Sequence, residues 1–180
     1  NNMRVCFIDA CGHWGQALRY LKTREDTVFC GFAPGSIEEN RTDSIDDSIP
    51  FFEDYCTMLD VTKPDLAVVS PVFGITGNII LACASRNINV FAEKPIAATP
   101  EELEQVKNAI NRSGIRFSAM HYLRFTPSFY HAARMVRSGK IGTVQMLTAQ
   151  KSYKYGIRPD WYSDPKLYCG TIPWVGIHAI

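Results

Sequence analysis

A lysine that directly follows an apolar stretch is the residue best placed to do chemistry. The stretch Val90–Ala92 is apolar and ends abruptly in Glu93-Lys94-Pro95. In a doubly wound parallel sheet, the carboxyl ends of the strands face the ligand crevice, so Lys94 would project where a cofactor and a substrate meet. An ammonium there can hold a hydroxyl or carbonyl oxygen and share its proton. The alternative is an ordinary exposed lysine after a strand.

A glycine-containing turn near the N-terminus is a second candidate. An apolar strand runs into Asp9-Ala10-Cys11-Gly12-His13-Trp14-Gly15, and the helical stretch 16–22 follows. Interpreted as a dinucleotide fingerprint, this is Ala-x-Gly-x-x-Gly: Gly12 would let the backbone approach a pyrophosphate, and Gly15 would let the helix pack closely on the strand. The phosphates would bind the N–H groups at the helix N-terminus, where the dipole favours anions. A strand-to-helix turn without a ligand is the alternative.

The end of the second predicted strand decides which dinucleotide would bind. A carboxylate that binds the ribose hydroxyls of NAD is expected there, but the sequence is Phe32-Ala33-Pro34-Gly35-Ser36. Ser36 and Arg41 could meet the 2′-phosphate of NADP instead, and a solvated loop explains them equally well. The cofactor therefore stays open between NAD and NADP.

The elements that would position these residues follow an alternating pattern. Short apolar runs alternate with helix-period segments up to about residue 120, which predicts an α/β fold with a parallel sheet. The predicted strands are Arg4–Asp9, Thr27–Phe32, Leu66–Ser70, Asn89–Ala92 and Ile115–Met120. Thr99-Pro100 begins a predicted helix that ends at Gly114, and Thr126-Pro127 begins another that stops near Gly139.

A change of character after Gly142 indicates a second domain. Thr143–Tyr153 has the composition of a long strand, and the segment 156–170, rich in Gly, Pro and Asp, shows no evident helix. We expect a dinucleotide-binding domain over residues 1–121. Residues 122–180 are then a linker helix and the start of a second domain, which is too short here for a core of its own.

Composition argues against several classes of binding partner. A formal net charge of +1 across 180 residues argues against nucleic acid and anionic membranes, and no apolar run reaches the ~20 residues of a spanning helix. The N-terminus lacks the pattern of a signal peptide, so a cytoplasmic location is expected. Six cysteines without a CxxC pair favour buried reduced thiols over disulfides, and no metal site is expected.

Four ordered motifs make the sequence resemble one family across its whole length. Similar to motifs of the glucose-fructose oxidoreductase and inositol dehydrogenase (Gfo/Idh/MocA) family are Glu93-Lys94-Pro95, the segment His121-Tyr122-Leu123-Arg124-Phe125-Thr126-Pro127, the lead-in Arg158-Pro159-Asp160-Trp161-Tyr162 and Gly170-Thr171-Ile172-Pro173-Trp174-Val175-Gly176-Ile177-His178. The resemblance implies a Rossmann-type sheet followed by an α+β domain with an open, mainly antiparallel sheet. In the family this second sheet also builds homodimers and homotetramers.

The resemblance also implies an activity and roles for individual residues. The activity would be hydride transfer between NAD or NADP and a secondary alcohol or ketone of a sugar, a sugar derivative or a cyclitol. Lys94 and His178 would be catalytic, with Lys94 holding the substrate hydroxyl and His178 accepting its proton. The cofactor would contact Ala10, Gly12, His13, Trp14, Gly15, Ser36, Ser70, Pro71, Glu93, Lys94 and Pro95, and the Lys94–Pro95 bond is often cis in the family. The substrate would contact Lys94, Arg124, Tyr155, Trp161, Trp174 and His178.

Two departures from the family pattern leave alternatives open. Many members carry Asp four residues before the histidine, where this chain has Trp174, and Cys169 replaces a usual glycine. Trp174 could offer its face to a sugar, or turnover could be lost. Trp161 and Tyr155 could contact a sugar or anchor a loop. The alternatives to a dehydrogenase are a non-catalytic regulatory homologue that binds nucleotide and an NAD-dependent glycosidase on the same fold.

Overall fold

The core of the molecule is a five-stranded parallel sheet. The computed structural model describes residues 2–35, 48–152, 154 and 156–178. The strands are β1 (Met3–Ile8), β2 (Thr27–Ala33), β3 (Leu66–Val69), β4 (Asn89–Ala92) and β5 (Phe117–Ala119), in the order β2-β1-β3-β4-β5. All five predicted strands are confirmed, each with its ends within two residues. The sheet shows the expected α/β class.

An isolated bridge extends the sheet beyond β2. Phe32 and Phe51 pair in parallel, with Phe32 N donating to Pro50 O (2.8 Å) and Phe52 N donating to Phe32 O (2.8 Å). If this bridge is counted as a strand, the order becomes 3-2-1-4-5-6, which is typical of the Rossmann fold. The strand order then reverses between β1 and β3, so the ligand crevice is expected at their carboxyl ends.

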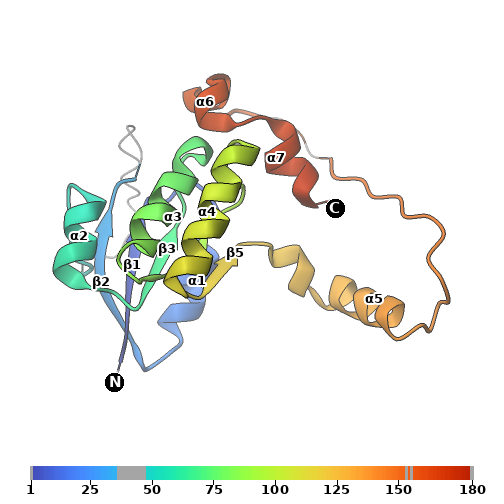
Figure 1. Cartoon of the computed structure of the whole chain (residues 1–180), viewed down its shortest axis with the longest axis horizontal. Coiled ribbons are helices and arrows are strands. Elements are labelled where there is room, and N and C mark those ends of the chain that lie inside the picture. Colours follow the sequence, from blue (N-terminus) through green and yellow to red (C-terminus); the bar gives the residue numbers. More distant parts are fainter. Residues whose placement is uncertain (1, 36–47, 153, 155, 179–180) are drawn as a thin grey trace.

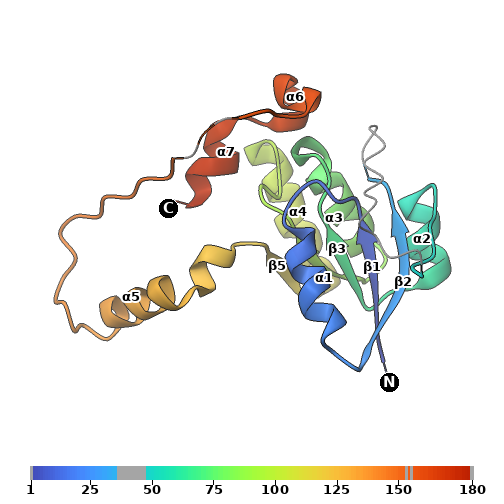
Figure 2. The same cartoon turned by 180° about the vertical axis from the view of Figure 1, so that it is seen from behind.

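Helices cover both faces of the sheet. On one face lies α1 (Trp14–Lys22), and on the other lie α3 (Thr76–Ala84) and α4 (Pro100–Ser113), while α2 (Tyr55–Thr62) packs on β2 (Figures 1 and 2). Alternate residues of β1 face the two layers, because side chains alternate along a strand. Val5 and Phe7 pack with α1, and Cys6 and Ile8 pack with α2 and α3.

The helix α4 confirms the sequence signals for its two ends. Thr99 Oγ1 accepts a hydrogen bond from Glu102 N (3.2 Å), and Pro100 occupies the first turn. Gly114 ends the helix at φ +69°, a left-handed conformation that glycine adopts without steric cost. These caps satisfy backbone groups at both ends of α4, which packs against α3.

The second half of the chain leaves the sheet and then returns. The single turn η2 (Tyr122–Phe125) leads into α5 (Pro127–Arg137), which confirms the second predicted helix. The following extended segment loops away from the sheet and comes back to its upper edge (Figures 1 and 2). The strand predicted over Thr143–Tyr153 is wrong for residues 143–152, which form no strand. These residues are exposed, and a strand needs a neighbour to pair with.

The segment that returns is more helical than its composition predicted. It contains η3 (Asp160–Ser163), α6 (Pro165–Tyr168), α7 (Thr171–Val175) and η4 (Gly176–His178). The expectation of no helix over 156–170 is therefore wrong. Asp164 Oδ1 accepts from Lys166 N (2.8 Å), so a side-chain cap starts α6 within the Pro-rich stretch. The antiparallel sheet expected of the second domain stays a prediction.

Three general findings complete the fold. All six cysteines are free, and Cys6, Cys30 and Cys83 are buried, which confirms the prediction of buried thiols. Across the described ranges, every helix is too short or too polar to traverse a lipid bilayer. In the same part of the chain, no three His, Cys, Asp or Glu side chains gather as metal ligands would.

Candidate functional site

The site begins where β1, β3 and β4 end side by side. Beyond β1, Cys11 N donates to Ser70 O (2.7 Å), and Gly12 N donates to Ser70 Oγ (3.0 Å). Ser70 and Pro71 follow β3 directly and are buried. The loop after β1 is thus fastened to the end of β3, and the predicted glycine turn faces the crevice at the strand reversal.

Glu93, at the end of β4, ties this turn to the catalytic candidate. Its side chain is fully buried and accepts hydrogen bonds from His13 N (2.5 Å) and Lys94 N (3.0 Å), and it lies 2.7 Å from His13 Nδ1. A Cβ at Gly12 would overlap the Glu93 carboxylate. Glycine is required at position 12 because this carboxylate fills the space. The predicted contact of Glu93 with a cofactor ribose stays a prediction.

The N-terminus of α1 offers room for an anion. Helix α1 begins at Trp14, and among the described residues no side chain caps it. The Trp14 ring is buried and packs edge-on against Phe7 (6.2 Å between centroids). A Cβ at Gly15 would meet open space, so the predicted close packing at Gly15 is wrong. An uncapped helix N-terminus beside open space suits the pyrophosphate of a dinucleotide.

Lys94 is held inside the crevice. Its side chain is 2% exposed, and the Lys94–Pro95 peptide bond is cis, as the resemblance implied. The ammonium donates to Trp174 O (2.8 Å) and lies over the Trp174 ring. The pKa of Lys94 is lowered to about 7, chiefly by burial; the charge of Glu93 opposes this effect and the charge of Lys151 adds to it. Lys94 can therefore exchange a proton near neutral pH.

His178 lies across a cavity of about 250 Å³ from the glycine turn. The cavity is lined by His13, Lys94, Tyr122, Lys151, Arg158, Tyr162, Trp174, Val175 and His178. Partial burial lowers the pKa of His178 to about 4, and the positive charges of Lys94 and Lys151 contribute. His178 is neutral at physiological pH, so its ring can accept a hydrogen bond from a substrate hydroxyl. The structure thus brings together Lys94, His178, His13 and Trp174.

The aromatic candidates have separate positions. One face of the Trp174 ring stacks on Phe73 (3.8 Å between centroids, 21° between planes), and the other faces Lys94 and His13. Trp161 is 4% exposed and packs edge-on against Phe73 at 4.9 Å, which favours the loop-anchor alternative. Cys169 has φ +63°, which explains the usual glycine at this position. Sugar contacts by the two tryptophans stay predictions.

The other predicted site residues lie apart from this cavity or outside the residues that the structure describes. Arg124 lines a second cavity, which shares His178 with the first. Ser36 and Tyr155 lie outside the described residues, as does Arg41. Sequence reasoning identified neither Lys151 nor Arg158 as a site residue, although Arg158 belongs to one of the family-like motifs; Lys151 lies in an irregular segment, where a basic residue carries no local signal of a site.

Comparison with known proteins identifies the family. Residues 15–121 match the model of the oxidoreductase family with an NAD-binding Rossmann fold, Gfo/Idh/MocA. The chain belongs to this family. The match confirms the family resemblance and the Rossmann-type fold, and it includes Glu93-Lys94-Pro95.

Individual relatives are more distant. The scyllo-inositol 2-dehydrogenase (NADP(+)) of Bacillus subtilis is 24% identical over 148 residues, which are 80% of this chain and 41% of that protein. The D-xylose 1-dehydrogenase (NADP(+)) 2 of Haloferax volcanii is 26% identical over 155 residues, 82% of this chain and 46% of that one. A solved Thermotoga maritima structure, provisionally named an oxidoreductase, is 37% identical with a TM-score of 0.90, covering 98% of this chain and 56% of its own. The chain spans less than half the length of each of these two curated relatives.

Proposed function

We propose that this Gfo/Idh/MocA chain carries the cofactor site and the acid–base residues of an NAD- or NADP-dependent dehydrogenase. Its substrate would be a secondary alcohol, or the matching ketone, of a sugar, a sugar derivative or a cyclitol. One observation carries the proposal: Lys94 and His178 line the same cavity, and His13 of the glycine turn borders it. The names of the two curated relatives support the substrate class.

The residues at the strand ends fit a dinucleotide. The uncapped N-terminus of α1 and the open space beside Gly15 would take the pyrophosphate. Ser70 and Glu93 hold the turn in shape through Gly12 N and His13 N. When bound, the nicotinamide supplies the hydride acceptor or donor. The choice between NAD and NADP depends on the segment after β2, where Ser36 lies.

Lys94 and His178 would divide the handling of the hydroxyl proton. During oxidation the hydroxyl loses a proton, and a group with a pKa near the working pH accepts it best. Lys94, with its pKa lowered to about 7, meets this condition, whereas His178, with a pKa of about 4, is the weaker base. We therefore assign proton transfer to Lys94 Nζ. His178 would orient the hydroxyl as a neutral hydrogen-bond partner.

The domain organisation is also part of this proposal. The binding domain would end at residue 121, after β5, and residues 122–180 would begin the substrate domain. Segment 160–174 already packs on the binding domain, because Trp161, Tyr168 and Trp174 surround Phe73 of η1 (Phe73–Ile75). Assembly as a homodimer or homotetramer would use the antiparallel sheet of the complete domain.

Nucleotide binding is the first test, and position 15 provides a sharp variant. Gly15→Asp places a carboxylate in open space at the first turn of α1, where negative charge favours the helix and repels phosphate. Gly15→Asn has the same shape without the charge and is the matched control. Calorimetric titration with NAD(H) and NADP(H) should show micromolar binding of one nucleotide to the parent protein. Gly15→Asp should lower the affinity for that nucleotide at least tenfold more than Gly15→Asn does.

The outcomes separate the alternatives. Binding of one nucleotide, followed by its reduction when a sugar or cyclitol is added, supports the dehydrogenase and identifies the cofactor. Binding without hydride exchange would instead favour a regulatory homologue, and sugar cleavage without net nucleotide reduction would favour a glycosidase. If neither nucleotide binds the folded protein, the proposal is lost.

A further inference from the structure

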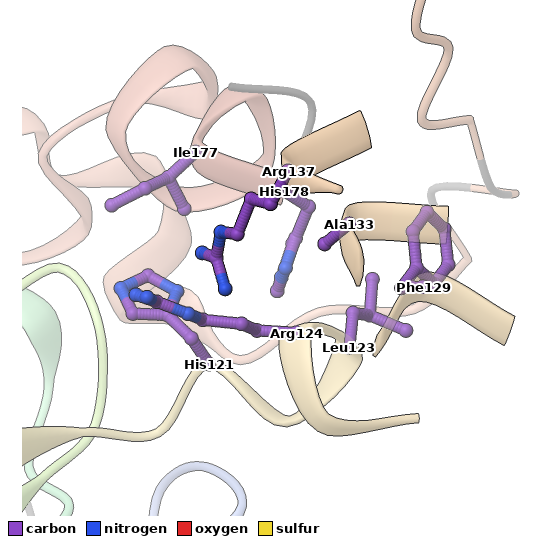
Figure 3. A pocket seen from close by; sticks show the side chains of 8 residues that line it. All are labelled: His121, Leu123, Arg124, Phe129, Ala133, Arg137, Ile177 and His178. Atoms are coloured by element: carbon purple, nitrogen blue, oxygen red, sulfur yellow. The ribbon is translucent and has the colours of Figure 1, made fainter. Parts of the chain in front are cut away.

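A second cavity lies on the far side of His178 from the glycine turn. It has a volume of about 460 Å³ and lies between η2, α5 and η4. Leu123, Phe129, Ala133 and Ile177 give it apolar walls. Figure 3 shows that the nitrogen-bearing ends of four other side chains turn toward the same hollow; these are His121, Arg124, Arg137 and His178.

The charge around this cavity has one sign. Among the residues that the structure describes, no carboxylate lines either of the two cavities, whereas Arg124, Arg137, Lys94, Lys151 and Arg158 do. The whole chain has 19 Lys and Arg against 18 Asp and Glu, so this concentration of positive charge is local. A cavity lined by charge of one sign gathers ligands of the opposite sign.

The two arginines of the second cavity are available to a ligand. Arg124 and Arg137 belong to different elements, η2 and α5, and their guanidinium groups converge on the cavity (Figure 3). Neither takes part in an ion pair with another described residue. A guanidinium fork matches the oxygens of a carboxylate or phosphate with two parallel hydrogen bonds.

Phosphates of the nucleotide do not account for these arginines. In the proposed function the pyrophosphate binds at the N-terminus of α1, which approaches the first cavity through His13. The second cavity is lined by no residue of the glycine turn. His178 borders both cavities, so a substrate that reacts beside Lys94 and His178 would extend into the second cavity with its remaining atoms.

We infer that the second cavity binds an anionic group of the substrate, so that the enzyme acts on a sugar acid or a sugar phosphate, with Arg124 and Arg137 as the specificity residues. The inference rests on the proposed function for the reacting end of the substrate. The apolar walls, Leu123 and Phe129 among them, would pack against the sugar carbons between the reacting hydroxyl and the anion.

The test uses matched sugars in calorimetric titrations, with and without saturating nucleotide. Glucose and galactose are each compared with their own uronate and their own 6-phosphate. The uronate or the 6-phosphate should bind at least tenfold more tightly than the neutral sugar. Whichever of these two ligands binds more tightly identifies the anionic group, a carboxylate or a phosphate. Arg124→Gln and Arg137→Gln should each weaken that binding about ten- to a hundred-fold, the usual effect of losing a hydrogen bond between charged groups.

Arg134→Gln is the matched control, since Arg134 lies on α5 one turn before Arg137 and does not line the cavity. It should leave binding of the anion unchanged. Equal binding of neutral and anionic sugars, or equal losses in Arg134→Gln and Arg137→Gln, would overturn the inference. Preference for the anion without nucleotide reduction would support the inference and refute the dehydrogenase, so the two failures are distinct.

Discussion

Replacing Lys94 by methionine should stabilise the folded protein while abolishing hydride transfer. The Lys94 side chain is 2% exposed, and its pKa falls from 10.5 to about 7. At about 1.36 kcal/mol per pKa unit, burying the ammonium costs on the order of 5 kcal/mol. The contacts of Nζ with the Trp174 carbonyl and ring offset ~2–4 kcal/mol of this cost. Methionine fills similar volume without charge, so Lys94→Met should stabilise the folded protein by about 1–3 kcal/mol at neutral pH.

The pH dependence of this gain identifies its cause. A lysine whose pKa is lowered by folding destabilises the protein wherever the unfolded chain holds the proton. The destabilisation is complete below the folded pKa of about 7, shrinks as the pH rises, and disappears above the unfolded value of 10.5. The stability advantage of Lys94→Met over the parent should therefore shrink as the pH rises from about 7 toward 10.5.

Urea unfolding followed by circular dichroism measures the difference. Parent and variant are compared at several pH values, so the titration of all other groups cancels in the difference. Lys140→Met, at an exposed lysine outside the site, should show no pH-dependent difference. If the advantage of Lys94→Met is the same at pH values near 6 and near 10, or if the variant is less stable throughout, burial of the ammonium is not its cause.

Three further results are expected. In the oxidation direction, kcat/KM should rise with pH through about 7 as Lys94 loses its proton. Lys94→Arg should abolish this rise. A rise centred near pH 4 would show that another group accepts the proton. Gly74→Ala should loosen segment 160–178 and speed its hydrogen exchange without unfolding the sheet, because a Cβ there would collide with the Lys166 carbonyl. Finally, Cys6 and Cys83 should resist thiol reagents until the protein unfolds, since burial raises the pKa of both thiols, that of Cys83 to about 12; rapid labelling of the native protein would contradict this.

The sheet and its crevice could be predicted from the sequence because each depends on local patterns. Apolar runs such as Val5–Ile8 need no partner information to be recognised as buried parallel strands. The caps of α4, Thr99 and Gly114, act within one turn of the helix. Lys94 could be placed because it ends a strand, and the carboxyl ends of parallel strands meet at one edge.

The second half of the chain could not be predicted as well, because its structure depends on distant contacts. Residues 143–152 have strand composition but no partner strand among the described residues, and they stay extended and exposed. The position of Trp161 depends on Phe73, 88 residues earlier by their numbering, so its burial leaves no local trace in the sequence. For the same reason, the role of Gly12 was assigned to a pyrophosphate, whereas its nearest constraint is the side chain of Glu93.

The electrostatics of the site follow from where its carboxylates are. The position at which many members of the family carry Asp holds Trp174, and the carboxylate of Glu93 contacts His13. Glu93 raises the pKa of Lys94, but no acidic side chain among the described residues lines either cavity, and positive groups there lower the pKa of neighbouring groups. Lys94 and Lys151 act on His178 in this way, and Lys94 also lowers the pKa of His121. Such a site favours a ligand that brings its own negative charge, and a bound anion would raise the pKa of Lys94 and of both histidines together.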